Sequence, residues 1–189
     1  MSIADPGQQP LLIGCLMKQA NHSQPSPVRW SALSHLNLLG RTGIPALKVF
    51  REAAVETRAV ADRYSIRRKG QLALLDLGPD AAPALPEVET LLAIPPDEKA
   101  RRESRWMSNG YREEKVLALR IAVAIGPKAK RLLPLLRAMA KDEKENPIVR
   151  KKAEEAAAAL APSGSDPFLG MEAIPCSTTL TKEFRDTPR

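Results

Sequence analysis

The sequence predicts an all-α fold, an α-solenoid of about three to four antiparallel helix pairs between flexible ends. Three observations lead to this prediction. A short motif recurs along the chain, and the residues before each copy are apolar at helical spacing. Aromatic residues make up only 4% of the chain, although 43% is hydrophobic. A core with so few rings must consist of Leu, Ala, Val and Ile, which suits closely packed helices better than a β-sandwich.

The recurring motif is Leu-Gly, followed at a fixed offset by Pro-Ala-Leu. It occurs at 39–47 and 77–85. A third copy at 125–134 begins Ile-Gly-Pro, and a degenerate fourth copy, Leu-Ala-Pro, covers 160–162. The second residues of successive copies are 38, 48 and 35 residues apart. This period predicts stacked units of two helices, with about ten extra residues before the third copy.

The glycine of each motif is expected to end the first helix of a pair. Gly40, Gly78 and Gly126 suit the C′ position, because glycine adopts the left-handed conformation without a Cβ penalty. The second helix should begin within a few residues. Pro86 and Pro134 would be awkward inside that helix, so it either begins near them or bends there.

The later helices have clear individual signals. Residues 116–125 are apolar around almost the whole helical surface, which predicts a helix contacted on several sides. Asn146 is a plausible N-cap and Pro147 a plausible first helical residue, so a last helix is expected over 147–160.

Composition shifts divide the chain. We expect a flexible N-terminal segment over 1–27, the helix-pair stack over 28–162 with an insertion at about 93–110, and a flexible tail over 163–189. Both end segments are polar or proline-bearing and, apart from Leu11 to Met17, lack a sustained helical face.

A composite pattern runs from about Trp30 to Pro162: a basic residue, Ala-x-x-Ala-Leu, Leu-Gly-Pro-x-Ala and Leu-Pro-x-Leu. Its best matches are Leu77-Gly78-Pro79, Ala81, Ala82, Leu85-Pro86, Ile125-Gly126-Pro127, Ala129, Leu133-Pro134, Val149-Arg150, Ala153, Ala156 and Leu160. This pattern resembles HEAT repeats, in particular the short type found in phycobiliprotein lyases. The resemblance implies an α-solenoid whose curved face binds another macromolecule. It says little about function, because the motif encodes packing.

The insertion at 93–110 is rich in arginine, carries Trp106 and is followed closely by Tyr111. Pro95-Pro96 and Asn109-Gly110 predict that much of it is loop. Arginine beside aromatic rings is a composition that stacks on bases and pairs with phosphates. The alternative is that Trp106 packs the insertion onto the helices and that the arginines are only solvated.

The chain is basic, with a formal net charge of +7 and a pI near 9.6, which favours an acidic partner. Between residues 97 and 152 there are 16 Lys/Arg against 8 Asp/Glu. The clusters at 67–69, 128–131 and 150–152 would form one basic ridge if equivalent positions align, or they are solvated helix faces. Our candidate partner-binding residues are Arg101, Arg102, Arg105, Trp106, Tyr111, Lys128, Lys130, Arg131, Arg150, Lys151 and Lys152.

The sequence offers no catalytic constellation. His22 and His35 have no Cys or carboxylate at ligand spacing, and Cys-x-x-Cys, His-Glu-x-x-His and phosphate-loop motifs do not occur. We therefore expect neither an enzyme nor a metal or cofactor site. Only Cys15 and Cys176 are present, which suggests a reducing, cytoplasmic location. No apolar run approaches the length of a membrane span, so no membrane insertion is expected.

The expected function is that of a non-enzymatic helical-repeat scaffold for protein–protein interaction, with an acidic protein as one form of partner. The alternative is a nucleic-acid-binding HEAT-like protein that uses the basic face and the Arg/Trp insertion. Some HEAT-like proteins are DNA glycosylases, but this chain offers no residue set for that reaction. A chaperone-like lyase for a chromophore-bearing protein is a third hypothesis.

Overall fold

The computed structural model describes residues 9–56, 63–94 and 105–161, and within these ranges the chain is all-α, without a strand. Regular α-helices alternate with short 3-10 helices. In chain order they are α1 (Gln9–Gln19), α2 (Ser26–Leu38), η1 (Gly40–Ala46), α3 (Leu47–Ala54), α4 (Arg63–Leu77), η2 (Gly78–Ala84), α5 (Leu85–Ala93), α7 (Arg105–Ile125), η3 (Gly126–Leu132), α8 (Leu133–Lys141) and α9 (Pro147–Leu160). The prediction of an all-α chain is confirmed.

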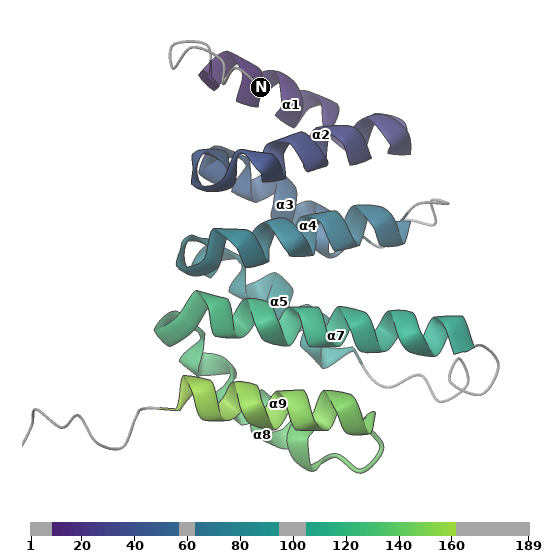
Figure 1. Cartoon of the computed structure of the whole chain (residues 1–189), viewed down its shortest axis with the longest axis vertical. Coiled ribbons are helices and arrows are strands. Elements are labelled where there is room, and N and C mark those ends of the chain that lie inside the picture. Colours follow the sequence, from purple (N-terminus) through teal and green to yellow (C-terminus); the bar gives the residue numbers. More distant parts are fainter. Residues whose placement is uncertain (1–8, 57–62, 95–104, 162–189) are drawn as a thin grey trace, which may run out of the picture.

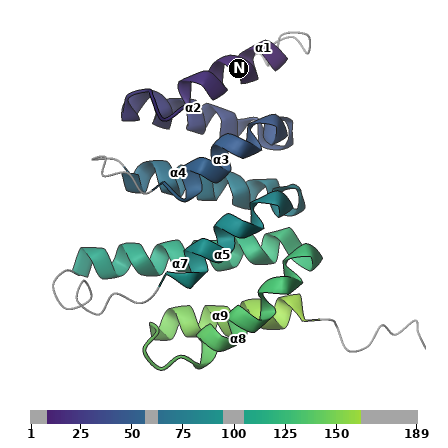
Figure 2. The same cartoon turned by 180° about the vertical axis from the view of Figure 1, so that it is seen from behind.

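The helices form two layers. The front layer consists of α2, α4, α7 and α9, which lie side by side along the long axis (Figure 1). The back layer consists of α3, α5 and α8 and is nearest the viewer in Figure 2. These back helices pack on α4, α7 and α9 respectively, so each back helix contacts the front helix that follows it in the chain. Helix α1 packs on α2 at the N-terminal end of the stack.

Glycine ends the first three front helices, as the sequence predicts. Gly40, Gly78 and Gly126 have φ values of 53°, 56° and 73°, the left-handed region that only glycine enters without strain. A seven-residue 3-10 helix begins at each glycine. Helices α5 and α8 then begin one residue before Pro86 and Pro134, so the helix begins at these prolines and does not bend there. A proline in the first turn costs no hydrogen bond, because the first N–H groups have no partner within the helix.

The last front helix is also capped as predicted. The Asn146 side chain accepts a hydrogen bond from the backbone N–H of Ile148 at 2.9 Å, and Pro147 is the first residue of α9. This side chain satisfies one of the free N–H groups at the start of the helix.

The segment over 1–27, which the sequence suggests is flexible, contains helix in the part that the structure describes. Residues 9–19 form α1, and α2 already begins at Ser26. Ile13 and Ala20 are both buried, because α1 covers the end of the stack that α2 would otherwise expose. Burial of a short apolar stretch therefore outweighs the polar composition around it. Residues 1–8 and the expected tail at 163–189 lie outside the described residues.

Small residues recur at one shared position of the front helices. Ala32, Gly70, Ala118 and Ala153 occupy the same place in α2, α4, α7 and α9, at the spacings of 38, 48 and 35 residues found in the motif. All four are buried. At Gly70 a Cβ atom would lie 2.5 Å from the backbone nitrogen of Ala54, so α3 and α4 touch there backbone to backbone.

Ion pairs join successive front helices. Three cations occupy a second shared position, again 38 and 48 residues apart, and each pairs with a carboxylate that lies in the next front helix or in the segment before it. The pairs are Arg29 with Glu56 (2.9 Å), Arg67 with Glu114 (3.1 Å) and Lys115 with Glu145 (2.8 Å). Arg29, Glu56, Lys115 and Glu145 are almost completely buried. A buried charge left without its partner is costly, so these pairs fix which helices can lie next to each other.

The outer side of α9 differs from this pattern. Arg150 occupies the position that Lys115 holds in α7, 35 residues earlier. It is half-buried and makes no ion pair within the part of the chain that the structure describes. One turn later, Glu154 is exposed where α7 has the buried Leu119. A polar residue at this place is compatible with a helix on whose outer side no other described helix packs.

Candidate protein-binding surface

Much of the predicted insertion lies outside the description. Arg101 and Arg102 belong to the residues that the structure does not describe, and the side chains of Arg105 and Trp106 are likewise not described. The backbone of 105–110 is the start of α7, so the prediction of a loop at Asn109-Gly110 is wrong. A glycine costs only about 1 kcal/mol inside a helix, which the contacts of a 21-residue helix outweigh. The roles of the arginines and Trp106 stay predictions.

Tyr111 belongs to a buried polar cluster. Its hydroxyl lies 3.2 Å from the carbonyl oxygen of Ile94 and 3.0 Å from Oε2 of Glu145. Nζ of Lys115 is 2.8 Å from the same carboxylate oxygen and 4.9 Å from the centre of the Tyr111 ring. Burial raises the pKa of Tyr111 well above its ordinary value, and the nearby Glu145 carboxylate raises it further. One face of this ring is therefore occupied by Lys115, which leaves it poorly placed to stack on a base.

The other predicted cations do not form a continuous ridge. Lys128, Lys130 and Arg131 are exposed on η3, directly after the C-terminal end of α7. Residues 150–152 lie near the N-terminal end of α9. The front helices run in the same direction, so these two groups lie at opposite edges of the layer (Figure 1). A continuous basic ridge would require the cations of η3 and those of α9 to lie at the same edge of the front layer.

Several cations are also neutralised within the fold. The Arg68 guanidinium pairs with Glu113, next to the pair of Arg67 with Glu114. The ammonium of Lys69 lies 4.6 Å from the centre of the Trp30 ring. The cluster at 67–69 is therefore engaged in contacts between neighbouring front helices, and its charge is less available to a partner.

The front layer carries two adjoining hollows. The larger one, of about 490 Å³, is lined mainly by apolar side chains that include Leu75 of α4, Val123 of α7 and Ala159 of α9. The smaller one, of about 380 Å³, lies between Leu72 of α4 and Ile148 of α9. Both are lined from α4, α7 and α9, and Val116 and Arg120 of α7 line both. We call the two hollows together the α7 groove.

Large apolar side chains are exposed to solvent in this groove. Val123 is 40% exposed and Ile148 is 48% exposed, although both lie among residues that pack the front layer. An exposed apolar hollow bordered by charge is typical of a surface that binds another molecule.

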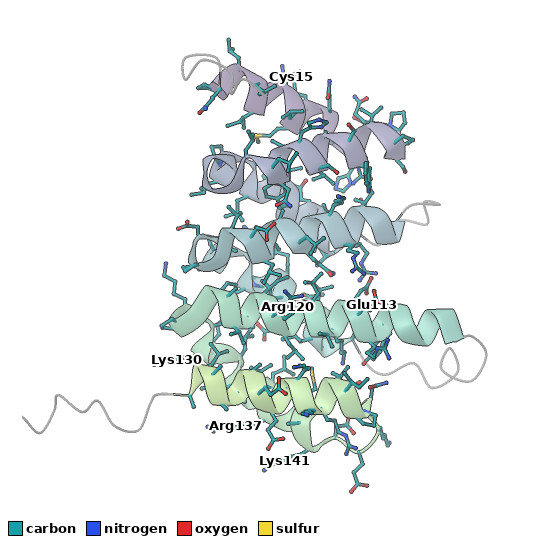
Figure 3. The ribbon with its side chains drawn as sticks, viewed as in Figure 1. Cys15, Glu113, Arg120, Lys130, Arg137 and Lys141 are labelled. Atoms are coloured by element: carbon teal, nitrogen blue, oxygen red, sulfur yellow. The ribbon has the colours of Figure 1, made fainter. Side chains whose placement is uncertain are left out.

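Two arginines give the groove its charge. Arg120 is exposed in the middle of α7 (Figure 3), and Arg112 lies two turns before it. Neither forms an ion pair with any described carboxylate. The remaining lining charges are internally paired: Arg68 with Glu113, and Lys152 with Glu155 at 2.6 Å. The hydrogen bond from Lys152 lowers the pKa of Glu155, so that carboxyl is ionised at neutral pH.

Sequence reasoning missed this groove. Residues 116–125 are apolar around almost the whole helical surface, which predicts a helix contacted on several sides and does not point to an open groove. Arg120 is the one charged residue in that stretch, and its exposure marks the side of α7 that faces solvent. The lone arginine was the available signal, but its neighbours at the groove come from α4 and α9, far away in the sequence.

The described residues contain no group of three or more His, Cys, Asp or Glu side chains placed to hold a metal ion. Within the same ranges, no helix is both long and apolar enough to cross a bilayer.

The α7 groove therefore combines two mainly apolar hollows with two arginines that form no ion pair with a described carboxylate. No protein-family model matches the chain, and neither curated proteins nor solved structures are detectably similar to it.

Proposed function

We propose that the protein is a non-enzymatic, HEAT-like helical-repeat scaffold that binds another protein through the α7 groove. The α-solenoid part of this proposal is supported by the alternation of front and back helices along the chain. It is also supported by the recurrence of the same motif, capping glycine and small residue at matching spacings. In such a stack each unit contacts only its neighbours, which leaves long open faces for partners.

The observation that carries the binding proposal is the α7 groove itself. Its exposed apolar side chains, Val123 and Ile148, belong to helices in which most of the other large apolar side chains that the structure describes are buried. A protein partner would remove this surface from water, at about 25 cal/mol for each Å² of apolar area. Arginine at such a surface is common among residues that contribute most to protein binding, and Arg120 is suitably placed.

Nucleic-acid binding is the alternative, and the exposed lysines of η3 favour it. Lys128 and Lys130 lie on the surface without an ion pair to any described residue. Against it, Arg131 lies 3.5 Å from Glu89, and the other basic clusters are split between two edges of the front layer. A phosphate backbone would meet a short basic patch and no long basic track.

The test uses two matched substitutions of exposed apolar residues on helices. Val123→Glu places a carboxylate in the α7 groove, and Ala138→Glu places one on α8 in the back layer. Both variants and the wild type are used as bait in extracts of the source organism, with quantitative mass spectrometry. We expect at least one protein that wild type and Ala138→Glu retain and Val123→Glu loses. If no protein depends on Val123, the proposal is wrong.

The nucleic-acid alternative is tested with wild type, Val123→Glu, Ala138→Glu and a variant in which Lys128 and Lys130 are replaced by Glu. Their binding to labelled duplex and single-stranded DNA is measured at about 50 and 200 mM salt, where phosphate-driven binding falls steeply. Salt-sensitive binding that survives Val123→Glu and is lost on replacing Lys128 and Lys130 by Glu would favour the nucleic-acid function. Circular dichroism of each variant checks that it is folded.

A further inference from the structure

We infer that the segment bound in the α7 groove is an amphipathic α-helix of the partner, with carboxylates beside its apolar face. This inference rests on the proposed function and names the chemistry of the partner at the same site. It depends on the direction of the groove, the spacing of its hollows and the position of its unpaired charge.

The groove follows α7. Helix α7 lies between α4 and α9 in the front layer (Figure 1), and both hollows are lined from all three helices. The α7 residues that line the smaller hollow fall within 112–120, and those that line the larger hollow fall within 116–124. The two hollows are therefore displaced by four residues along α7, or about 6 Å at the rise of an α-helix.

A partner helix lying along α7 matches that displacement. Its side chains at i and i+4 lie on one face about 6 Å apart, so one apolar side chain would enter each hollow. An extended strand also repeats at about 6.6 Å on one face. However, the groove is formed by side chains of helices, whose backbone groups are already paired within each helix. A strand would leave its own N–H and C=O groups unpaired there, whereas a helix satisfies them itself.

The two arginines of the groove determine which residues flank the apolar face of the partner helix. Arg120 lines both hollows, and it projects from the middle of α7 (Figure 3). Arg112 borders the smaller hollow. Both lack a described carboxylate partner, whereas Glu113 and Glu155 are already paired with Arg68 and Lys152. An aspartate or glutamate of the partner, next to the two apolar anchors, would supply the paired hydrogen bonds that a guanidinium makes with a carboxylate.

The test is selection from a display library of 16-residue helical peptides, randomised at surface positions, against the whole chain. We expect enriched peptides to carry large apolar residues at i and i+4 flanked by Asp or Glu. The strongest peptide is then labelled with fluorescein, and its Kd is measured by anisotropy. Arg120→Glu should weaken binding about tenfold or more, because it replaces a charge-assisted pair by repulsion.

Two controls make the result specific. Arg137→Glu makes the same charge change on α8, at an exposed residue that lies away from the groove (Figure 3), and should leave the Kd unchanged. A peptide with Lys in place of its acidic residues should bind Arg120→Glu more tightly than it binds the wild type. Such charge-swap rescue requires direct pairing and does not follow from a general loss of folding.

The outcomes separate this inference from the proposed function. One contrary result is a set of selected peptides that depend on Val123 but carry no acidic residues, and another is a Kd that Arg120→Glu does not change. Either result would refute the acidic helix but would still support a protein-binding groove. Selection that yields no peptide dependent on Val123 would refute both. Duplex DNA that displaces the peptide and itself depends on Arg120 would show that the groove binds nucleic acid.

Discussion

Gly70 lies at a close contact between the two layers. Besides its approach to Ala54, an added Cβ atom would lie 2.7 Å from the carbonyl oxygen of Phe50. Both neighbours are backbone atoms, so no side-chain rotation could make room. The helices α3 and α4 would have to move apart.

We therefore expect Gly70→Ala to destabilise the protein by about 1–3 kcal/mol, as overpacking in a core does, even though alanine is the better helix former. The matched control is Gly14→Ala in α1, where an added Cβ meets nothing within 4 Å. That change should be neutral or stabilising, by up to about 1 kcal/mol. Urea unfolding followed by circular dichroism measures both, and equal effects of the two substitutions would contradict the backbone contact.

At this scale the sequence predicts some residues well and others poorly. Gly40, Gly78 and Gly126 are recognisable because each follows an apolar run and sits in a recurring motif. Gly70 sits inside a helical stretch, and only its alignment with buried alanines in the other front helices shows why it is small. That alignment depends on the helix register, which the structure provides.

Helix α7 contacts α4, α5 and α9, and Tyr111 makes several of the polar contacts near its start. The Tyr111 hydroxyl reaches both the residue after α5 and the carboxylate that precedes α9. The same carboxylate holds the Lys115 ammonium. Three separate segments therefore meet at one polar cluster near the start of α7.

This cluster makes stability depend on pH in alkaline solution. The pKa of Tyr111 is raised by burial and by Glu145, whereas an unfolded chain releases the tyrosine proton near pH 10. Above that pH the native state holds a proton that the unfolded state has lost, so the stabilisation is complete below pH 10 and declines as the pH rises.

We expect the free energy of unfolding of the wild type, relative to Tyr111→Phe, to be constant from pH 8 to about 9.5. Above about pH 10 it should fall by at most about 1.4 kcal/mol per pH unit. Denaturant titrations of both proteins across this range give the difference, and the subtraction removes the titration of other tyrosines and lysines. A difference that stays flat to pH 11 would contradict the raised pKa.

The front helices and their glycine ends were largely predictable, but the short elements between them were not. The apolar periodicity and the capping glycines indicate where the front helices end. The 3-10 helices after those glycines were not predicted, because turn residues and short helices have similar sequences. Helix α1 was missed because it is stabilised by covering α2, and that contact is not visible within the N-terminal sequence alone.

At the scale of the whole molecule, charge is distributed differently from what a linear count suggests. The excess of basic residues between 97 and 152 predicts a basic surface, yet Arg131, Lys152 and the buried Lys115 are each close to a carboxylate. The cations could be counted in the sequence, but their carboxylate partners lie on other helices. The α7 groove was unpredictable for the same reason, since three helices contribute to it.

The position of Arg150 would allow another helix pair to be added after α9. Inserting a second copy of residues 127–161 after residue 161 would add one more back helix and one more front helix at the established spacing of 35 residues. The Glu145 of the added copy would then lie beside Arg150, as the original Glu145 lies beside Lys115. The Arg150 guanidinium, which pairs with no described carboxylate, would then form one more ion pair between neighbouring front helices.

Glu154 determines how readily such an extension is accepted. It takes the place of the buried Leu119, so the added helix would bury its carboxylate unless Glu154→Leu is introduced as well. We expect the lengthened chain with Glu154→Leu to show a larger denaturant m value and greater stability than the original, because more surface is buried on folding. An unchanged m value would mean that the new helices do not dock. Adding one helix pair to the protein would then require only the duplication of residues 127–161 and the substitution Glu154→Leu.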